Sequence, residues 1–134
     1  MRALFGVNVL ISGLLSRRGA PARLLGNWLE GEFELVVTER LLAELEVTLG
    51  RPKLRRHFDD ADVREFLQLL RGLAETVEDP AAEPGIISRD PKDDYLIAAA
   101  AFARAMLVTG DAHLLELEGS IPVHSPRAFL DSLP

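Results

Sequence analysis

Short apolar runs alternate with stretches of helical spacing along this 134-residue chain. Residues 2–7 (RALFGV) and 33–37 (FELVV) are compact apolar runs, which are typical of buried strands in a parallel sheet. Residues 106–108 and 121–123 predict two more strands, and residues 86–87 are a candidate for a further short extended piece. The pattern therefore predicts a sheet of four to five strands.

Apolar residues at helical spacing fill the intervals between the predicted strands. In the first half of the chain, a helix is expected over residues 8–15, with Asn8 at its start. Pro21 stands in the first turn of the next helix, where proline is tolerated. Thr38 is expected to cap a third helix, which ends at Gly50.

The second half of the chain continues the same alternation. Asp59 or Asp60 is expected to cap a long helix whose apolar face reaches Val77. Asp90 is expected to cap an alanine-rich helix, and Ser125 begins a last one. Alternation of strands and helices predicts an α/β fold, with a central parallel sheet covered by helices on both faces. We expect a single domain spanning residues 1–134.

Length and composition restrict the possible chemistry. A chain of 134 residues has the common size of one domain and can bury a full core. There is no cysteine, so disulfides, thiolate metal sites and cysteine nucleophiles are excluded. No apolar run approaches the roughly 20 residues that span a bilayer, and Asn8 and Ser12 interrupt the apolar N-terminus. We expect a cytoplasmic protein without a membrane segment.

The formal charge of −6 argues against a protein that coats nucleic acid through general electrostatics. It does not exclude a nuclease, because carboxylates that bind a divalent cation count as negative until the metal arrives. One local basic cluster is the best candidate for phosphate contacts, although such a cluster is usually a solvated face. It consists of Arg51, Lys53, Arg55 and Arg56, and the pair Arg17 and Arg18 is the second candidate.

Polar residues follow the predicted strands at the positions where ligands bind in an open parallel sheet. Three of the four positions present acids. Hard cations such as Mg²⁺ or Mn²⁺ prefer all-oxygen clusters of this kind. The residues are Gly6 and Asn8 after the first strand, Glu44 one turn into the helix after the second, Asp90, Asp93 and Asp94 at the start of the alanine-rich helix, and Thr109 and Asp111 after residues 106–108.

Five stretches of the chain, in order and over most of its length, carry a family resemblance. They are RALFGVNVLISGLL (2–15), GAPARLL (19–25), LVVTERLLAEL (35–45), RDPKDDYLIAAA (89–100) and LVTGDAHLL (107–115). Together they resemble the PIN domain, the fold of many prokaryotic toxin–antitoxin ribonucleases.

The resemblance implies a site for one or two Mg²⁺ or Mn²⁺ ions, which activate water for attack on an RNA phosphodiester. It implies Glu44, Asp94 and Asp111 as the metal-binding and catalytic acids. Asn8, Asp93 and Thr109 are expected to support them. It also implies RNA as substrate, an antitoxin protein as partner, and a homodimer formed through helices.

The chain departs from the family pattern at two places. The first strand of a PIN domain normally ends in Asp-Thr-Asn, whereas here Gly6 and Val7 precede Asn8. Glycine offers only backbone groups, so we expect weaker metal binding and poorer alignment of the attacking water. His113 stands where a further aspartate is often found.

Simpler interpretations of the same residues remain open. Glu44 could be a solvated helix residue, Asp94 could interact with the helix dipole, and Asp111 could cap a turn. Asn8 could cap a helix or hold a carboxylate, and Thr109 could be an ordinary turn residue.

Two hypotheses about function follow. The first is a PIN-type, toxin-like ribonuclease with activity weakened by Gly6. The second is a degenerate PIN domain that no longer cleaves and instead binds RNA or a protein. A nucleotide-binding or phosphoacceptor domain is disfavoured, because the chain contains neither G-x-G-x-x-G after its first strand nor a P-loop motif.

Overall fold

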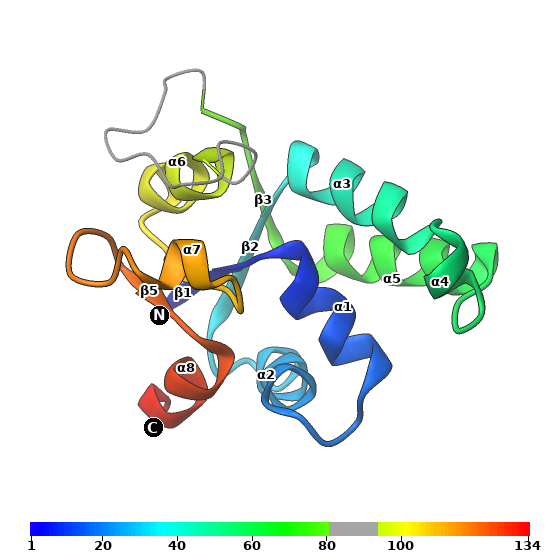
Figure 1. The fold of residues 1–134 in the computed structure, drawn as a ribbon, viewed down its shortest axis with the longest axis horizontal. Helices are drawn as coiled ribbons and strands as arrows, with labels where there is room; N and C mark the ends of the chain where they lie inside the picture. Colours follow the sequence, from blue (N-terminus) through cyan, green and yellow to red (C-terminus); the bar gives the residue numbers. More distant parts are fainter. Residues whose placement is uncertain (81–93) are drawn as a thin grey trace.

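The computed structural model describes residues 1–80 and 94–134 (Figure 1). Within these residues the chain forms one five-stranded parallel sheet, in the order β3-β2-β1-β4-β5. The α/β class and the parallel sheet predicted from the sequence are therefore confirmed. The strands are β1 (Arg2–Phe5), β2 (Glu34–Thr38), β3 (Glu75–Val77), β4 (Met106–Val108) and β5 (Val123–His124).

Helices connect the strands and pack against one another in pairs. Helix α2 packs against α1 and α8, α3 packs against α1 and α5, and α6 packs against β1 and β4. In the described part of the chain, no helix has the length and apolar character needed to cross a membrane. The helices are α1 (Val7–Leu15), α2 (Ala20–Leu29), α3 (Glu39–Leu49), α4 (Pro52–Arg55), α5 (Asp60–Leu73), α6 (Asp94–Ala103), α7 (Ala112–Leu115) and α8 (Pro126–Ser132).

The direction of the strand order reverses beside β1. Strands β2 and β3 lie on one side of β1, and β4 and β5, which come later in the chain, lie on its other side. Because crossovers between parallel strands are right-handed, the two directions send their helices to opposite faces of the sheet. Figure 1 shows α6 on one side of the central strands and α1 and α3 on the other. Such a reversal opens a crevice at the carboxyl ends of β1 and β4, which is where α/β proteins bind ligands.

The core fixes the end of β1. Ala3, Leu4 and Phe5 have no exposed surface, as expected for a central parallel strand. The Phe5 ring lies 5.7 Å from that of Phe33, and the Phe33 ring lies 5.2 Å from that of Phe129, measured between ring centroids. Aromatic pairs at such distances add packing energy beyond the area that they bury. The last residue of β1 is therefore held firmly beside the crevice.

The predicted helix caps at Thr38, Asp59 and Ser125 are confirmed. The Thr38 hydroxyl accepts the N–H of Leu41 at 3.1 Å. Asp59 and Asp62 form a reciprocal capping box at the start of α5. Ser125 likewise caps the first turn of α8. These side chains satisfy backbone donors that a helix start leaves without a partner.

The prediction of a long helix reaching Val77 is wrong in its last turn. Helix α5 ends at Leu73, Ala74 is extended, and residues 75–77 form the edge strand β3 beside β2. Val77 has helical spacing from the apolar residues of α5, but Thr76 and Val77 are β-branched and favour a strand. Pairing with β2 decides between the two possibilities.

Three other expectations differ from the structure or lie outside it. Helix α1 has Gly6 at its N-cap without a side-chain hydrogen bond, so Asn8 is not the cap but part of the first turn. The C-terminal strand is Val123–His124, not residues 121–123. The predictions for residues 86–87 and for Asp90 lie outside the described residues.

Candidate functional site

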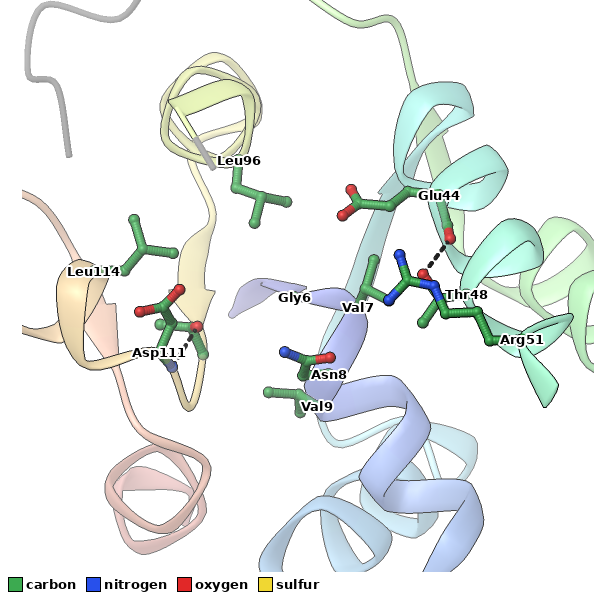
Figure 2. A pocket seen from close by; sticks show the side chains of 11 residues that line it. Gly6, Val7, Asn8, Val9, Glu44, Thr48, Arg51, Leu96, Asp111 and Leu114 are labelled. Atoms are coloured by element: carbon green, nitrogen blue, oxygen red, sulfur yellow. Dashed lines mark hydrogen bonds between the residues drawn. The ribbon is translucent and has the colours of Figure 1, made fainter. Parts of the chain in front are cut away.

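A hollow of about 190 Å³ opens in the crevice where β1 and β4 end (Figure 2). Segments from β1–α1, α3, α6 and the turn after β4 meet there, although they are far apart in the sequence. This is the place at which the sequence predicted a site. The lining residues are Gly6, Val7, Asn8, Val9, Glu44, Thr48, Arg51, Leu96, Thr109, Asp111 and Leu114.

Gly6 has an ordinary backbone conformation, with φ −63° and ψ 158°. Its N–H donates to the carbonyl of Val108 at 2.9 Å, and its carbonyl accepts from Val9 and Leu10 at 3.1 and 3.2 Å. A Cβ at this position would meet only atoms of Thr109 and Val108, none nearer than 3.7 Å. The backbone therefore does not require glycine, and the polar groups of Gly6 are already used in holding strand and helix together.

Glu44 lies on α3 and is exposed toward the hollow. Its carboxylate accepts a hydrogen bond from the Tyr95 hydroxyl on α6. The Arg40 guanidinium lies over the Tyr95 ring, with its central carbon 4.1 Å from the ring centroid. Glu44 is thus exposed, as a solvated helix residue would be, and it also contacts a residue from another element.

Asp111 has two partners in the turn after β4. Its N–H donates to the Thr109 hydroxyl at 3.0 Å, and its carboxylate accepts the backbone N–H of His113 at 2.8 Å. Thr109 is buried, and its own N–H donates to the carbonyl of His124 at 3.0 Å. The turn-capping interpretation of Asp111 and the structural role of Thr109 are therefore observed. Asp111 also lines the hollow across from Glu44 (Figure 2).

The other candidate residues occupy different positions. Asn8 lines the hollow, two residues after Gly6 and in the first turn of α1. Asp94 is half-buried at the start of α6 and is not among the residues that line the hollow. The side chain of His113 is exposed, outside that lining, and Asp93 lies outside the described residues. The hollow thus brings together Asn8, Glu44, Thr109 and Asp111 of the predicted set.

The donor chemistry of the hollow suits a hard divalent cation, but the number of anionic donors is small. Glu44 and Asp111 supply carboxylates and Asn8 supplies an amide oxygen. Across residues 1–80 and 94–134, no group of three or more histidine, aspartate or glutamate side chains is placed to hold a metal ion. Glu44, Asp111 and Asn8 are therefore the described residues that could contribute ligands, and they would leave most positions around an ion to water.

The sequence alone did not identify Tyr95 and Thr48 as residues of this region. The Tyr95–Glu44 contact joins residues 51 positions apart, and it depends on how the side chain from α6 reaches α3 across the crevice. Thr48 lies one turn after Glu44, and its hydroxyl donates to the Glu44 carbonyl at 2.8 Å. Its spacing of four residues from Glu44, which places both on one face of a helix, is the feature of the sequence that could have identified it. In the sequence, Arg51 stands out only as a member of the basic cluster at residues 51–56.

Comparison with known proteins gives three findings. A family model described as PIN domain matches residues 2–113. The uncharacterized protein MJ1680 of Methanocaldococcus jannaschii is 24% identical over 143 aligned residues, which cover 98% of this chain and 90% of that protein. A chain in the crystal structure of VapBC2 from Rickettsia felis, bound to a DNA fragment from their promoter, superposes with a TM-score of 0.63. It is 17% identical, and the match covers 93% of this chain and 98% of that one.

Proposed function

Because the chain belongs to the PIN-domain family, we propose that it is a toxin-like, metal-dependent ribonuclease with a weakened metal site. One observation carries the proposal. Asn8, Glu44 and Asp111 line a single hollow at the reversal point of the sheet, although they come from three separate segments. That edge of a parallel sheet is where a ligand is expected, and PIN domains generally bind divalent metals.

Glu44 and Asp111 are the carboxylates that would hold Mg²⁺ or Mn²⁺, with Asp94 as the third acid implied by the family pattern. A bound ion of this kind supplies a water of lowered pKa and neutralises charge on the phosphodiester. The Tyr95 hydroxyl orients the carboxylate of Glu44. The Thr109 hydroxyl fixes the turn that carries Asp111. Asp93 remains a proposed supporting residue.

Gly6 is the reason for proposing weakened activity. It stands where the family normally has an aspartate, and both of its backbone polar groups are already hydrogen-bonded. It therefore cannot replace a missing anionic ligand. Fewer charged ligands lower the affinity for the metal, and looser coordination leaves the attacking water less well aligned.

The direct test is cleavage of single-stranded RNA with Mg²⁺ or Mn²⁺, with and without EDTA. We expect slow cleavage that EDTA abolishes and that the triple variant Glu44→Ala/Asp94→Ala/Asp111→Ala lacks. Glu46→Ala is a matched control, because Glu46 is an exposed acid on α3 that does not line the hollow. Cleavage that persists in EDTA, or in the triple variant, would refute the proposal.

A second function is favoured by a specific observation. The loss of the carboxylate at residue 6, together with the absence of a three-acid group among the described residues, suits a PIN domain that binds RNA or a protein without cleaving. RNA binding without metal-dependent cleavage would support this alternative. A cleavage rate that is ordinary for the family would exclude it.

The proposed partners rest on the family and on one structural relative. VapBC2 from Rickettsia felis was crystallised with DNA from its promoter. By analogy we propose an antitoxin protein as partner and a homodimer formed through helices. Light scattering of the purified chain tests the homodimer. A monomer at every concentration would contradict it.

A further inference from the structure

Arg51 places a positive charge in a hollow whose other charged residues are acids. It is the one cationic side chain among the described residues that line this space, together with Glu44 and Asp111. Figure 2 shows its guanidinium extending past Thr48 toward Val7, on the same side of the hollow as α3. The cation therefore lies within the site and not merely near it.

The backbone of Arg51 is fixed on both sides. Its N–H donates to the carbonyl of Thr48 at 3.1 Å, and its carbonyl accepts from Leu54 and Arg55 at 2.9 and 3.0 Å. Arg51 is the N-cap of α4 and precedes Pro52, which confines it to the extended conformation observed, φ −67° and ψ 146°. The base of the side chain is thus anchored at the corner between α3 and α4.

The guanidinium itself has no ion pair in the part of the chain that the structure describes. Among the described residues four arginines form ion pairs, so Arg51 is distinguished not by being unpaired but by lying beside two carboxylates that it does not contact. The pairs are Arg2 with Glu34 and Glu75, Arg55 with Asp60, Arg71 with Glu39, and Arg127 with Asp131. Arg51 has two carboxylates in the same hollow but stays more than 4.0 Å from both, since no salt bridge joins them.

We propose that the Arg51 guanidinium binds a backbone phosphate of single-stranded RNA seated in the hollow. This inference rests on the proposed function, because it assumes that RNA is the substrate. A guanidinium matches a phosphate with two parallel hydrogen bonds, and such charge-assisted contacts are stronger than neutral ones. The acids of the hollow repel a phosphate until a metal binds.

Gly6 makes this contribution more important. A site that holds its metal weakly spends more time without it, and the exposed guanidinium at its edge then supplies the attraction for the phosphate. Arg51 thereby becomes the residue that retains RNA when the metal is absent. The other members of the basic cluster lie outside the lining of the hollow.

The test measures RNA binding in EDTA, so that neither metal nor cleavage contributes. The probe is a short fluorescein-labelled single-stranded RNA, and the readout is fluorescence anisotropy over a series of salt concentrations. The variants are Arg51→Gln and Arg51→Lys. The matched control is Arg64→Gln, which removes the same charge from an exposed site on α5 away from the hollow.

We expect Arg51→Gln to weaken binding roughly tenfold, the lower end for a hydrogen bond to a charged group. The slope of log affinity against log salt should fall by roughly 0.7, the value for one phosphate contact on a single strand. Arg51→Lys should lose less, because it keeps the charge but not the paired geometry. A DNA of the same sequence should show the same loss, since the contact involves the phosphate.

Equal binding by Arg51→Gln and Arg64→Gln would overturn the inference, as would a loss seen with RNA but not with DNA. Melting curves of the variants show whether they remain folded. Arg51→Lys provides a second, milder comparison if Arg51→Gln does not fold. A failure of the proposed ribonuclease function appears only in the metal-dependent cleavage assay, so the two failures can be told apart.

Discussion

A Gly6→Asp variant places a carboxylate in the hollow that Glu44 and Asp111 line. The backbone at residue 6 has a conformation open to any L-amino acid, and a Cβ would meet its nearest neighbours at 3.7 Å or more. Those distances are ordinary van der Waals contacts. The substitution should therefore fold without displacing the ends of β1 or β4.

The added charge has two opposing effects. Without metal, a third carboxylate repels the other two and, because residue 6 is buried, also loses part of its hydration, so we expect the metal-free variant to be less stable than the wild type. With metal, it supplies another anionic ligand, and we expect the affinity for Mn²⁺ to rise at least roughly tenfold, which is about 1.4 kcal/mol. Mn²⁺ at a hundred times its dissociation constant should then stabilise the variant by roughly 2.7 kcal/mol.

Isothermal titration calorimetry with Mn²⁺ measures the affinity, and thermal melting with and without Mn²⁺ measures the stabilisation. Gly6→Asn is the matched control, because it has nearly the same shape and an oxygen donor but no charge. We expect the affinity for Mn²⁺ to be highest in Gly6→Asp, lower in Gly6→Asn and lowest in the wild type. If Gly6→Asp binds Mn²⁺ no better than Gly6→Asn, the hollow is not a metal site that lacks one carboxylate.

Three further changes test other parts of the account. Tyr95→Phe removes the hydroxyl that holds Glu44 and should weaken Mn²⁺ binding roughly tenfold by calorimetry, whereas an unchanged affinity would show that orientation of Glu44 is unimportant. Asp59→Ala removes the capping box of α5 and should lower the free energy of unfolding in urea by about 1 kcal/mol. Arg2→Met removes side-chain hydrogen bonds to α6, β2 and β3 and should lower the free energy of unfolding by roughly 1–2 kcal/mol. A decrease of less than roughly 0.5 kcal/mol, as is usual for a surface substitution, would contradict a stabilising role of these contacts.

Most of the scaffold could be predicted because it depends on local patterns. The buried run in β1, the apolar faces of the helices and the caps at Thr38 and Asp59 are each determined by a few neighbouring residues. The carboxyl edge of the sheet could be predicted as the place of a site, because parallel strands end on the same side. The acids Glu44 and Asp111 then follow from their places after β2 and β4.

The remainder depends on contacts between distant segments. Strand β3 carries residues with helical spacing, and only pairing with β2 makes it a strand. Helix α7 has only four residues and is stabilised by the Asp111 cap. It is too short to show the apolar periodicity from which a helix can be predicted. The hydrogen bond from Tyr95 to Glu44 joins side chains from helices that lie on opposite sides of the central strands. No pattern within either helix specifies that approach.

Asp94 illustrates the limit of a family pattern. The resemblance implies it as a third acid of the site, and it lies in α6, the alanine-rich helix that the sequence predicts. Leu96, two residues later, lines the hollow, whereas Asp94 does not. A helix can be placed correctly while the direction of one side chain in its first turn depends on neighbours outside the helix.

Titration of the isotopically labelled 14.7 kDa chain with Mn²⁺, followed by NMR, locates a metal ion in the hollow residue by residue. Paramagnetic broadening reports which amides lie near the ion. We expect the signals of Gly6, Asn8, Glu44 and Asp111 to broaden first, the broadening to need a large excess of Mn²⁺, and EDTA to reverse it. Broadening that begins elsewhere, or none around the hollow at saturating Mn²⁺, would contradict the assignment of a weakened metal site.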